Sequence, residues 1–182
     1  MSNTCPSQQR EDLRQQVIFE YQLAKINAEP VFDAVTELAA DLFSVPISAV
    51  TVLGRDRQLL PGVWGLKDRS TPRADAFCNV TVERNEIFIV EDALIDPQFR
   101  DNPLVTGEPH IRFYAGAPIR IGGGTAVGSL CIIDRKPRQL TEVDRRRLLL
   151  ITRTVVDLME LRLASHREHG NENQAELAQT NI

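Results

Sequence analysis

Three residues that could do chemistry stand at every second position of one short segment: His110, Arg112 and Tyr114. In a β-strand, such spacing places all three side chains on one face. There they could line a cavity and hydrogen-bond a polar or anionic ligand, because an Arg guanidinium and a Tyr hydroxyl both suit carboxylate or phosphate oxygens. In the alternative interpretation, Arg112 is structural and pins a nearby loop by pairing with one of three carboxylates, Asp92, Asp96 or Asp101.

The three cysteines, Cys5, Cys78 and Cys131, allow a redox or metal hypothesis. Their spacing matches no zinc signature, although Cys78, Cys131 and His110 could converge in the fold. Buried cysteines usually pack as small apolar side chains, so inert packing of Cys78 and Cys131 is the competing interpretation. An odd number of widely separated cysteines is typical of reduced thiols rather than of a disulfide framework.

The elements that must position these residues begin with a predicted hairpin. Apolar residues alternate with polar or small ones from His110 to Ile119, which predicts a strand buried on one face only. Gly122-Gly123-Gly124 supplies the positive φ angles of a tight turn. The segment 126–133 is almost wholly apolar and predicts a central strand covered on both sides.

The rest of the chain predicts helices at both ends of the sequence and further strands between them. We expect a helix over about residues 7–27 and a second one from Pro30, because a proline is tolerated in the first turn. Strands are predicted at 47–53, 58–66 and 87–90, with a bulge or an edge position at Pro61-Gly62. We also expect a short helix from Thr71-Pro72 to residue 77 or 78, an irregular segment over 95–109, and a last helix from the capping box at Thr141.

Two apolar stripes predict contacts beyond the sheet. The first helix carries a narrow stripe, and the last helix carries a second stripe beyond the one needed for packing on a sheet. We expect these surfaces to form a homodimer interface through seven residues: Leu13, Val17, Tyr21, Leu149, Val156, Met159 and Leu163.

Composition limits the class of protein. The 182 residues suit one globular domain, and a net charge of −4 gives no basic footprint for nucleic acid. The sequence contains neither a membrane-spanning apolar run nor an apolar stretch in the polar N-terminus, so we expect no membrane association and a cytoplasmic location.

Several short motifs in combination carry a family resemblance: Phe77-Cys78, Asp92-Ala93, Asp96-Pro97, Asp101-Asn102-Pro103, the run from His110 to Gly116, and Leu130 to Asp134. Together they closely resemble bacterial GAF domains, small-molecule-sensing modules often found beside histidine kinase or diguanylate cyclase domains. The resemblance covers residues 28–164. It divides the chain into an N-terminal helix, 1–27, for dimerisation or signalling, the GAF domain, and a polar C-terminal tail, 165–182.

The resemblance implies an α+β fold. A central, mostly antiparallel sheet of five to six strands would carry the terminal helices on one face, and short helices and loops, including residues 96–105, over a cavity on the other. It implies nine candidates for contact with a ligand: Trp64, Phe77, Cys78, Asp92, Phe99, His110, Arg112, Tyr114 and Cys131.

The resemblance does not name the ligand. Bilin-binding members attach the chromophore through a Cys usually followed by His, whereas Cys78 precedes Asn79 here. The Asn-Lys…Phe…Asp-Glu motif of cyclic-nucleotide-binding members is missing, and only His110 could serve as the histidine ligand of haem-binding members. No catalytic or metal-ligating residue is predicted, and the cofactor stays unknown.

The leading prediction is a regulatory module that senses a small molecule and signals through its terminal helices to a partner such as a kinase or cyclase. One alternative is a dimerisation module with a cavity filled by its own side chains. The other is an enzyme similar to the free methionine-(R)-sulfoxide reductases, which share this fold and need a thiolate of low pKa with a resolving cysteine.

Overall fold

The computed structural model describes residues 5–25 and 28–180, with side chains up to residue 165. The sheet has six strands in the order β3-β2-β1-β6-β5-β4, and every neighbouring pair is antiparallel. The strands are β1 (Ile47–Leu53), β2 (Arg57–Trp64), β3 (Ser70–Pro72), β4 (Phe88–Val90), β5 (Phe113–Ile121) and β6 (Thr125–Asp134). The helices are α1 (Pro6–Glu20), α2 (Pro30–Phe43), α3 (Cys78–Arg84), α4 (Pro103–Thr106) and α5 (Glu142–Thr180), with 3₁₀ turns η1 (Leu23–Lys25) and η2 (Arg73–Asp75).

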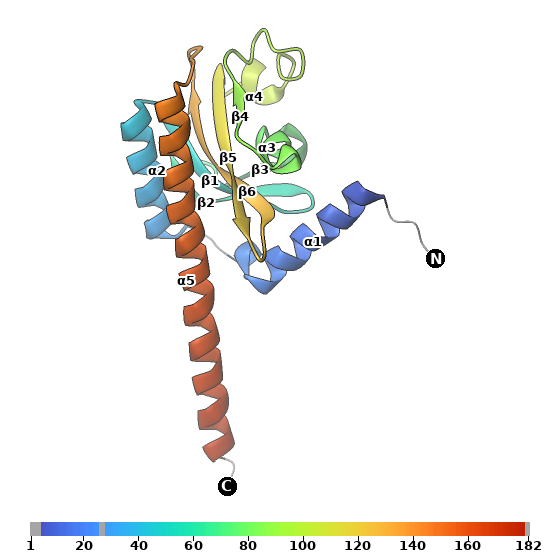
Figure 1. Cartoon of the computed structure of the whole chain (residues 1–182), viewed down its shortest axis with the longest axis vertical. Coiled ribbons are helices and arrows are strands. Elements are labelled where there is room, and N and C mark those ends of the chain that lie inside the picture. Colours follow the sequence, from blue (N-terminus) through green and yellow to red (C-terminus); the bar gives the residue numbers. More distant parts are fainter. Residues whose placement is uncertain (1–4, 26–27, 181–182) are drawn as a thin grey trace.

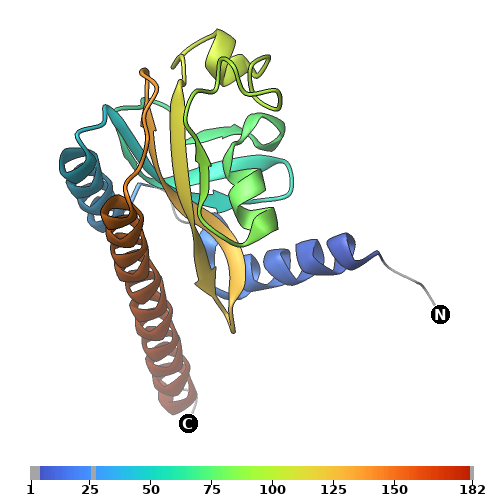
Figure 2. The same ribbon diagram turned by 45° about the horizontal axis from the view of Figure 1, so that its top comes forward.

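Helices cover the two faces of the sheet differently, as Figure 1 shows. The helices α2 and α5 lie side by side on one face, while the short helices α3 and α4 lie on the other. Helix α1 crosses the end of the sheet below the β5–β6 hairpin and reaches toward the α3 side (Figures 1 and 2). The predicted α+β architecture is thus confirmed.

Alternation along the strands builds a core on each face. On β5, Phe113, Ala115 and Ala117 point into the core under α2 and α5, whereas Tyr114 points to the α3 side. The expectation that this strand is buried on one face only is wrong, because the short helices cover the other face and Tyr114 is also buried. The predicted central position of 126–133 is confirmed, since β6 lies between β1 and β5.

Local sequence signals predicted several boundaries of helices and strands correctly. The three hairpin glycines have φ values of 54°, 82° and 102°, a region in which side chains other than glycine are strained. The Thr141 hydroxyl accepts from the backbone N–H of Asp144, whose carboxylate accepts from that of Thr141, as a capping box requires. The pairing of β1 with β2 shifts opposite Leu60-Pro61, which confirms the predicted bulge.

Two predicted helices have different bounds. The segment 73–78 is not one short helix: a 3₁₀ turn, η2, is followed by α3, which begins at Cys78. The first helix ends at Glu20 rather than near residue 27, because Gln22 adopts a left-handed φ of 52°. Residues 26 and 27 lie outside the described part of the chain.

The residues predicted to form a dimer interface fall into two groups. Val17, Tyr21, Met159 and Leu163 are buried inside this chain. Tyr21, for example, bonds the carboxylate of Glu160 at 3.0 Å. Three side chains are exposed or half-buried and could contact a partner: Leu13, Leu149 and Val156. The homodimer stays a prediction.

No helix in the described part of the chain combines the length and the apolar character needed to cross a bilayer.

Candidate functional site

A cavity of about 480 Å³ lies between the sheet and the segments that cover its α3 face. Its floor is formed by side chains of β1, β2, β5 and β6, and its sides by three covering segments: residues 65–71, 76–78 and 104–111. Its apolar lining comes chiefly from Ala49, Leu60, Leu66, Phe77, Ile111 and Ile133. The volume and the mixture of apolar and polar groups are typical of small-molecule sites, whose volumes are about 300–1,000 Å³.

An aromatic cluster supports the wall of the cavity from behind. The Phe77 ring stacks on Phe99 with centroids 4.0 Å apart and lies 5.2 Å from the Tyr114 ring, while Phe88 packs against Phe99 and Tyr114. Phe77 and Tyr114 line the cavity, but Phe99 does not. Phe99 therefore orients Phe77 rather than facing a ligand.

The floor carries a small polar group in an otherwise apolar surface. The Gln58 amide donates to the Thr71 hydroxyl at 3.2 Å and accepts from the Cys78 thiol. Thr51, the next polar side chain of the floor, bonds the Ser129 hydroxyl and carbonyl. Gln58 and Thr71 can bond a ligand atom as well, since each has hydrogen-bonding capacity left, whereas the Thr51 hydroxyl is fully used by Ser129.

Tyr114 links the floor to the covering helix. Its hydroxyl lies 2.9 Å from the Thr81 hydroxyl on α3, and both side chains are buried. The ring lies over Gly116, where a Cβ would collide with the Tyr114 hydroxyl. Burial raises the pKa of Tyr114 well above its ordinary value, so the hydroxyl stays neutral and able to donate.

Both cysteine candidates face the cavity as protonated thiols. Burial raises the pKa of Cys78 to about 12, and it raises the pKa of Cys131 as well. Cys131 donates to the Ala49 carbonyl at 3.5 Å. Neither thiol meets the requirement for a thiolate nucleophile, which needs a lowered pKa and access to solvent, because both are buried.

The mouth of the cavity carries charges of both signs. It contains four exposed charged residues: Lys67, Asp68, Glu108 and Arg135. Arg69 bonds Asp33 on α2 through two contacts of 2.7 and 2.8 Å, and this pair holds the segment 65–69 at the mouth. The Arg69 guanidinium lowers the pKa of Asp33, which therefore stays ionised at neutral pH.

Four of the nine predicted site residues line the cavity: Phe77, Cys78, Tyr114 and Cys131. Arg112 instead makes two 2.7 Å bonds to Asp92, which is the structural alternative that the sequence left open. The Arg112 guanidinium lowers the pKa of Asp92 and ties the end of β4 to the start of β5.

His110 and Trp64 also lie outside the cavity lining. The His110 side chain is 55% exposed, because it precedes β5 and its φ of 61° breaks the alternation expected from the sequence. Trp64 is 40% exposed at the end of β2. The spacing of His110, Arg112 and Tyr114 therefore does not correspond to one functional face.

Sequence reasoning missed the polar groups of the floor and the mouth. Gln58 carried a usable signal, because it is a polar residue in the otherwise apolar predicted strand 58–66, and Thr51 carried a weaker one, since Ser48 in the same strand is also polar. Lys67, Glu108 and Arg135 come from loops whose course no periodic pattern reveals. Among the residues with described side chains, no group of three or more His, Cys, Asp or Glu is gathered as metal ligands would be.

Comparison with known proteins gives matches at three levels. The GAF domain family model matches residues 27–163. A cyclic di-GMP phosphodiesterase of Pseudomonas aeruginosa is 43% identical over 135 residues, which are 74% of this chain but only 23% of that protein. The chain thus spans about a quarter of the length of this relative.

Solved structures share the fold at low sequence identity. The GAF domain of an Acinetobacter phosphoenolpyruvate-protein phosphotransferase is 19% identical, with a TM-score of 0.63 over 90% of this chain and 97% of that one. A type II free methionine-R-sulfoxide reductase of Thermoplasma acidophilum is 16% identical, with a TM-score of 0.56 over 86% and 96% of the two chains.

Proposed function

This chain belongs to the GAF domain family, and we propose that it is a cytoplasmic regulatory module that binds a small molecule in the cavity on the α3 face of its sheet. The cavity is the observation that carries this proposal. Its walls are apolar, and apart from the charged residues at the mouth its few polar groups lie together at the floor, an arrangement that orients a ligand by a small number of hydrogen bonds.

The ligand class follows from the lining. The apolar walls favour a compact, largely apolar body, and Gln58 and Thr71 offer donors and acceptors to a polar group carried on it. The mouth carries Lys67 and Arg135 beside Asp68 and Glu108, so it selects for neither a strongly anionic nor a strongly cationic ligand.

The output is proposed to pass through the terminal helices. Tyr114 faces the cavity, while its neighbours on β5 pack under α5 on the opposite face of the sheet. Helix α5 has 39 residues and, at 1.5 Å per residue, extends about 58 Å, well beyond the sheet (Figure 1). A shift of β5 on ligand binding would therefore be carried to a kinase, cyclase or other effector, or across a homodimer.

Two enzymatic alternatives are weaker. The reductase hypothesis needs a thiolate of low pKa, whereas burial raises the pKa of both cavity cysteines. The phosphodiesterase name belongs to a relative of which this chain matches 23%, so we assign to this chain a regulatory rather than a hydrolytic role.

A thermal-shift screen of cellular metabolites tests the proposal, with wild-type protein compared with Ala49→Phe, which fills the cavity from its floor. A ligand at 100 times its Kd stabilises the native state by about 2.7 kcal/mol, and Ala49→Phe should abolish that shift. Cys131→Met, on the neighbouring strand, provides a second filled cavity. Leu94→Phe is the control, since Leu94 is exposed and outside the lining.

A metabolite that stabilises wild type and Leu94→Phe but neither filled variant supports a ligand site in this cavity. Equal shifts in all four proteins, or no shift with any metabolite, would contradict it and favour a dimerisation module without a ligand.

A further inference from the structure

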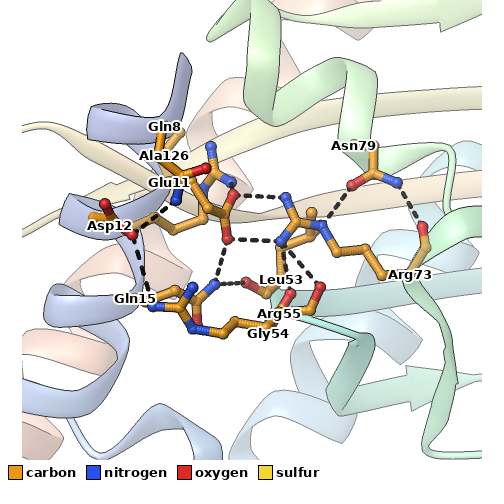
Figure 3. Close-up of polar contacts among 11 residues, drawn as sticks. Gln8, Glu11, Asp12, Gln15, Leu53, Gly54, Arg55, Arg73, Asn79 and Ala126 are labelled. Carbon is orange, nitrogen blue, oxygen red and sulfur yellow. Dashed lines mark hydrogen bonds and ion pairs between the residues drawn. The ribbon is translucent and has the colours of Figure 1, made fainter. Parts of the chain in front are cut away.

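An ion pair joins the N-terminal helix to the segment that walls the cavity, as Figure 3 shows. Glu11 on α1 accepts two hydrogen bonds of 2.7 Å from the two terminal nitrogens of the Arg73 guanidinium, in η2. The two residues are 62 positions apart in the sequence, and their side chains are about one-fifth exposed. Such two-point pairing fixes both position and orientation.

Arg73 is held rigidly within its own part of the fold. Its guanidinium donates to the carbonyl of Gly54 at 2.9 Å and to the Asn79 side chain at 3.0 Å, and the Asn79 amide donates back to the Arg73 carbonyl (Figure 3). Arg73 thus connects η2, the first turn of α3 and the β1–β2 turn. A movement of Glu11 is therefore transmitted through Arg73 to all three of these elements.

The inner side of the same segment lines the cavity. Ala76, Phe77 and Cys78 lie three to five residues after Arg73, and all three line the cavity. The Asn102 side chain also bonds the Asp75 carbonyl, which ties α4 to this segment. One short stretch, residues 73–78, therefore contacts α1 on its outer side and faces the cavity on its inner side. We call it the wall segment.

The N-terminal half of α1 depends on polar contacts for its attachment. No described residue before Arg14 is buried, and Leu13 is 49% exposed. Besides the Arg73 pair, Glu11 also binds Arg14 and Gln15, which in turn donate to the carbonyls of Ala126 and Leu53. With so little apolar burial, loss of the Glu11 carboxylate removes the centre of this attachment.

We propose that the Glu11–Arg73 pair is a latch that couples docking of α1 to closure of the wall segment. Whatever pulls α1 away from the sheet opens the cavity, and by linkage an occupied cavity holds α1 in place. This gives the N-terminal helix control over ligand access, separate from any output through α5. The inference rests on the proposed function only in taking the cavity as the ligand site.

The cysteines provide a test that needs no ligand. Cys78 lies in the wall segment and Cys131 on the floor, and both are buried, so each reacts with N-ethylmaleimide only when the structure around it opens. The experiment uses the full chain with Cys5→Ser, because Cys5 is exposed. Peptide mass spectrometry then follows the labelling of Cys78 and Cys131 separately in the same sample.

Glu11→Gln is compared with Glu20→Gln, a matched control on the exposed side of α1 whose carboxylate bonds only Gln16 among the described contacts. We expect Glu11→Gln to label Cys78 and Cys131 about fivefold faster or more, because an opened wall segment exposes the floor of the cavity as well, and Glu20→Gln to change neither rate. Hydrogen exchange of the amides of residues 6–15 should rise in the same variant.

Two results would overturn the latch. One is an unchanged Cys78 rate in Glu11→Gln while α1 exchanges faster, since α1 would then undock without opening the wall. The other is acceleration of both thiols together with equally faster hydrogen exchange in the central strand β6, which would report global unfolding. Either outcome leaves the ligand site itself to be judged by the metabolite screen.

Discussion

The hydrogen bond between Tyr114 and Thr81 permits a quantitative prediction about how the covering helix is held on the sheet. Tyr114→Phe removes the hydroxyl and leaves the ring in its aromatic cluster. The lost bond spans 2.9 Å between two fully buried side chains, so its net contribution is about 0.5–1.5 kcal/mol. Leaving the Thr81 hydroxyl unpaired adds a desolvation cost, which brings the expected loss to about 1–3 kcal/mol.

A double-mutant cycle in urea separates the bond from the packing. Urea unfolding curves are recorded at pH 7 for wild type, Tyr114→Phe, Thr81→Val and the double variant. Their free energies of unfolding are then compared at constant m-value. Each single variant leaves one hydroxyl without its partner, whereas the double variant leaves none. We therefore expect the double variant to lose less stability than the sum of the two, with a coupling energy of about 0.5–1.5 kcal/mol.

Additive losses would refute this reasoning, because they would show that the two hydroxyls do not depend on one another. A loss below about 0.5 kcal/mol for Tyr114→Phe would also do so, since a buried hydroxyl that stabilises α3 cannot be removed at no cost.

Two further predictions concern ionisation. The Arg73 guanidinium lowers the pKa of Glu11 to about 2 from an ordinary value of 4.5, so the ionised carboxylate stabilises the fold above pH 4.5 and this contribution is lost as the pH falls toward 2. In urea titrations, the free energy of unfolding of wild type should exceed that of Glu11→Gln by about 1–2 kcal/mol at pH 7 after solvent screening, and this difference should disappear in acid. A difference that does not depend on pH would be inconsistent with the ion pair. Separately, Ellman's reagent at pH 8 should modify one thiol per native chain, Cys5, because Cys78 and Cys131 are buried and protonated, and all three after unfolding; three rapid reactions in native protein would contradict the buried placement.

The parts of the fold that sequence predicted well are those with local causes. The capping box at Thr141 and the glycines at 122–124 specify their own backbone geometry, so the start of α5 and the β5–β6 hairpin follow directly. The order of elements also followed from local signals, whereas the presence of a cavity came from the family motifs, because local signals alone do not give it.

The errors come from contacts between distant segments. His110 and Tyr114 have the spacing of one strand face, but the left-handed backbone at His110 turns its side chain away from that face. Arg112 instead forms an ion pair with Asp92. The end of α1 was likewise misplaced, because Tyr21 leaves the helix and bonds Glu160, 139 residues away. Periodicity cannot detect such pairings, which depend on where α5 and β5 lie in space.

The central claim is that the cavity holds a small molecule. Native mass spectrometry of the full chain purified from cells, compared with its denatured mass, tests this most directly. We expect a non-covalent adduct of a few hundred daltons that is present on wild type and on Leu94→Phe but missing from Ala49→Phe. A bare polypeptide mass for wild type, or an adduct that survives filling of the cavity, would contradict the claim.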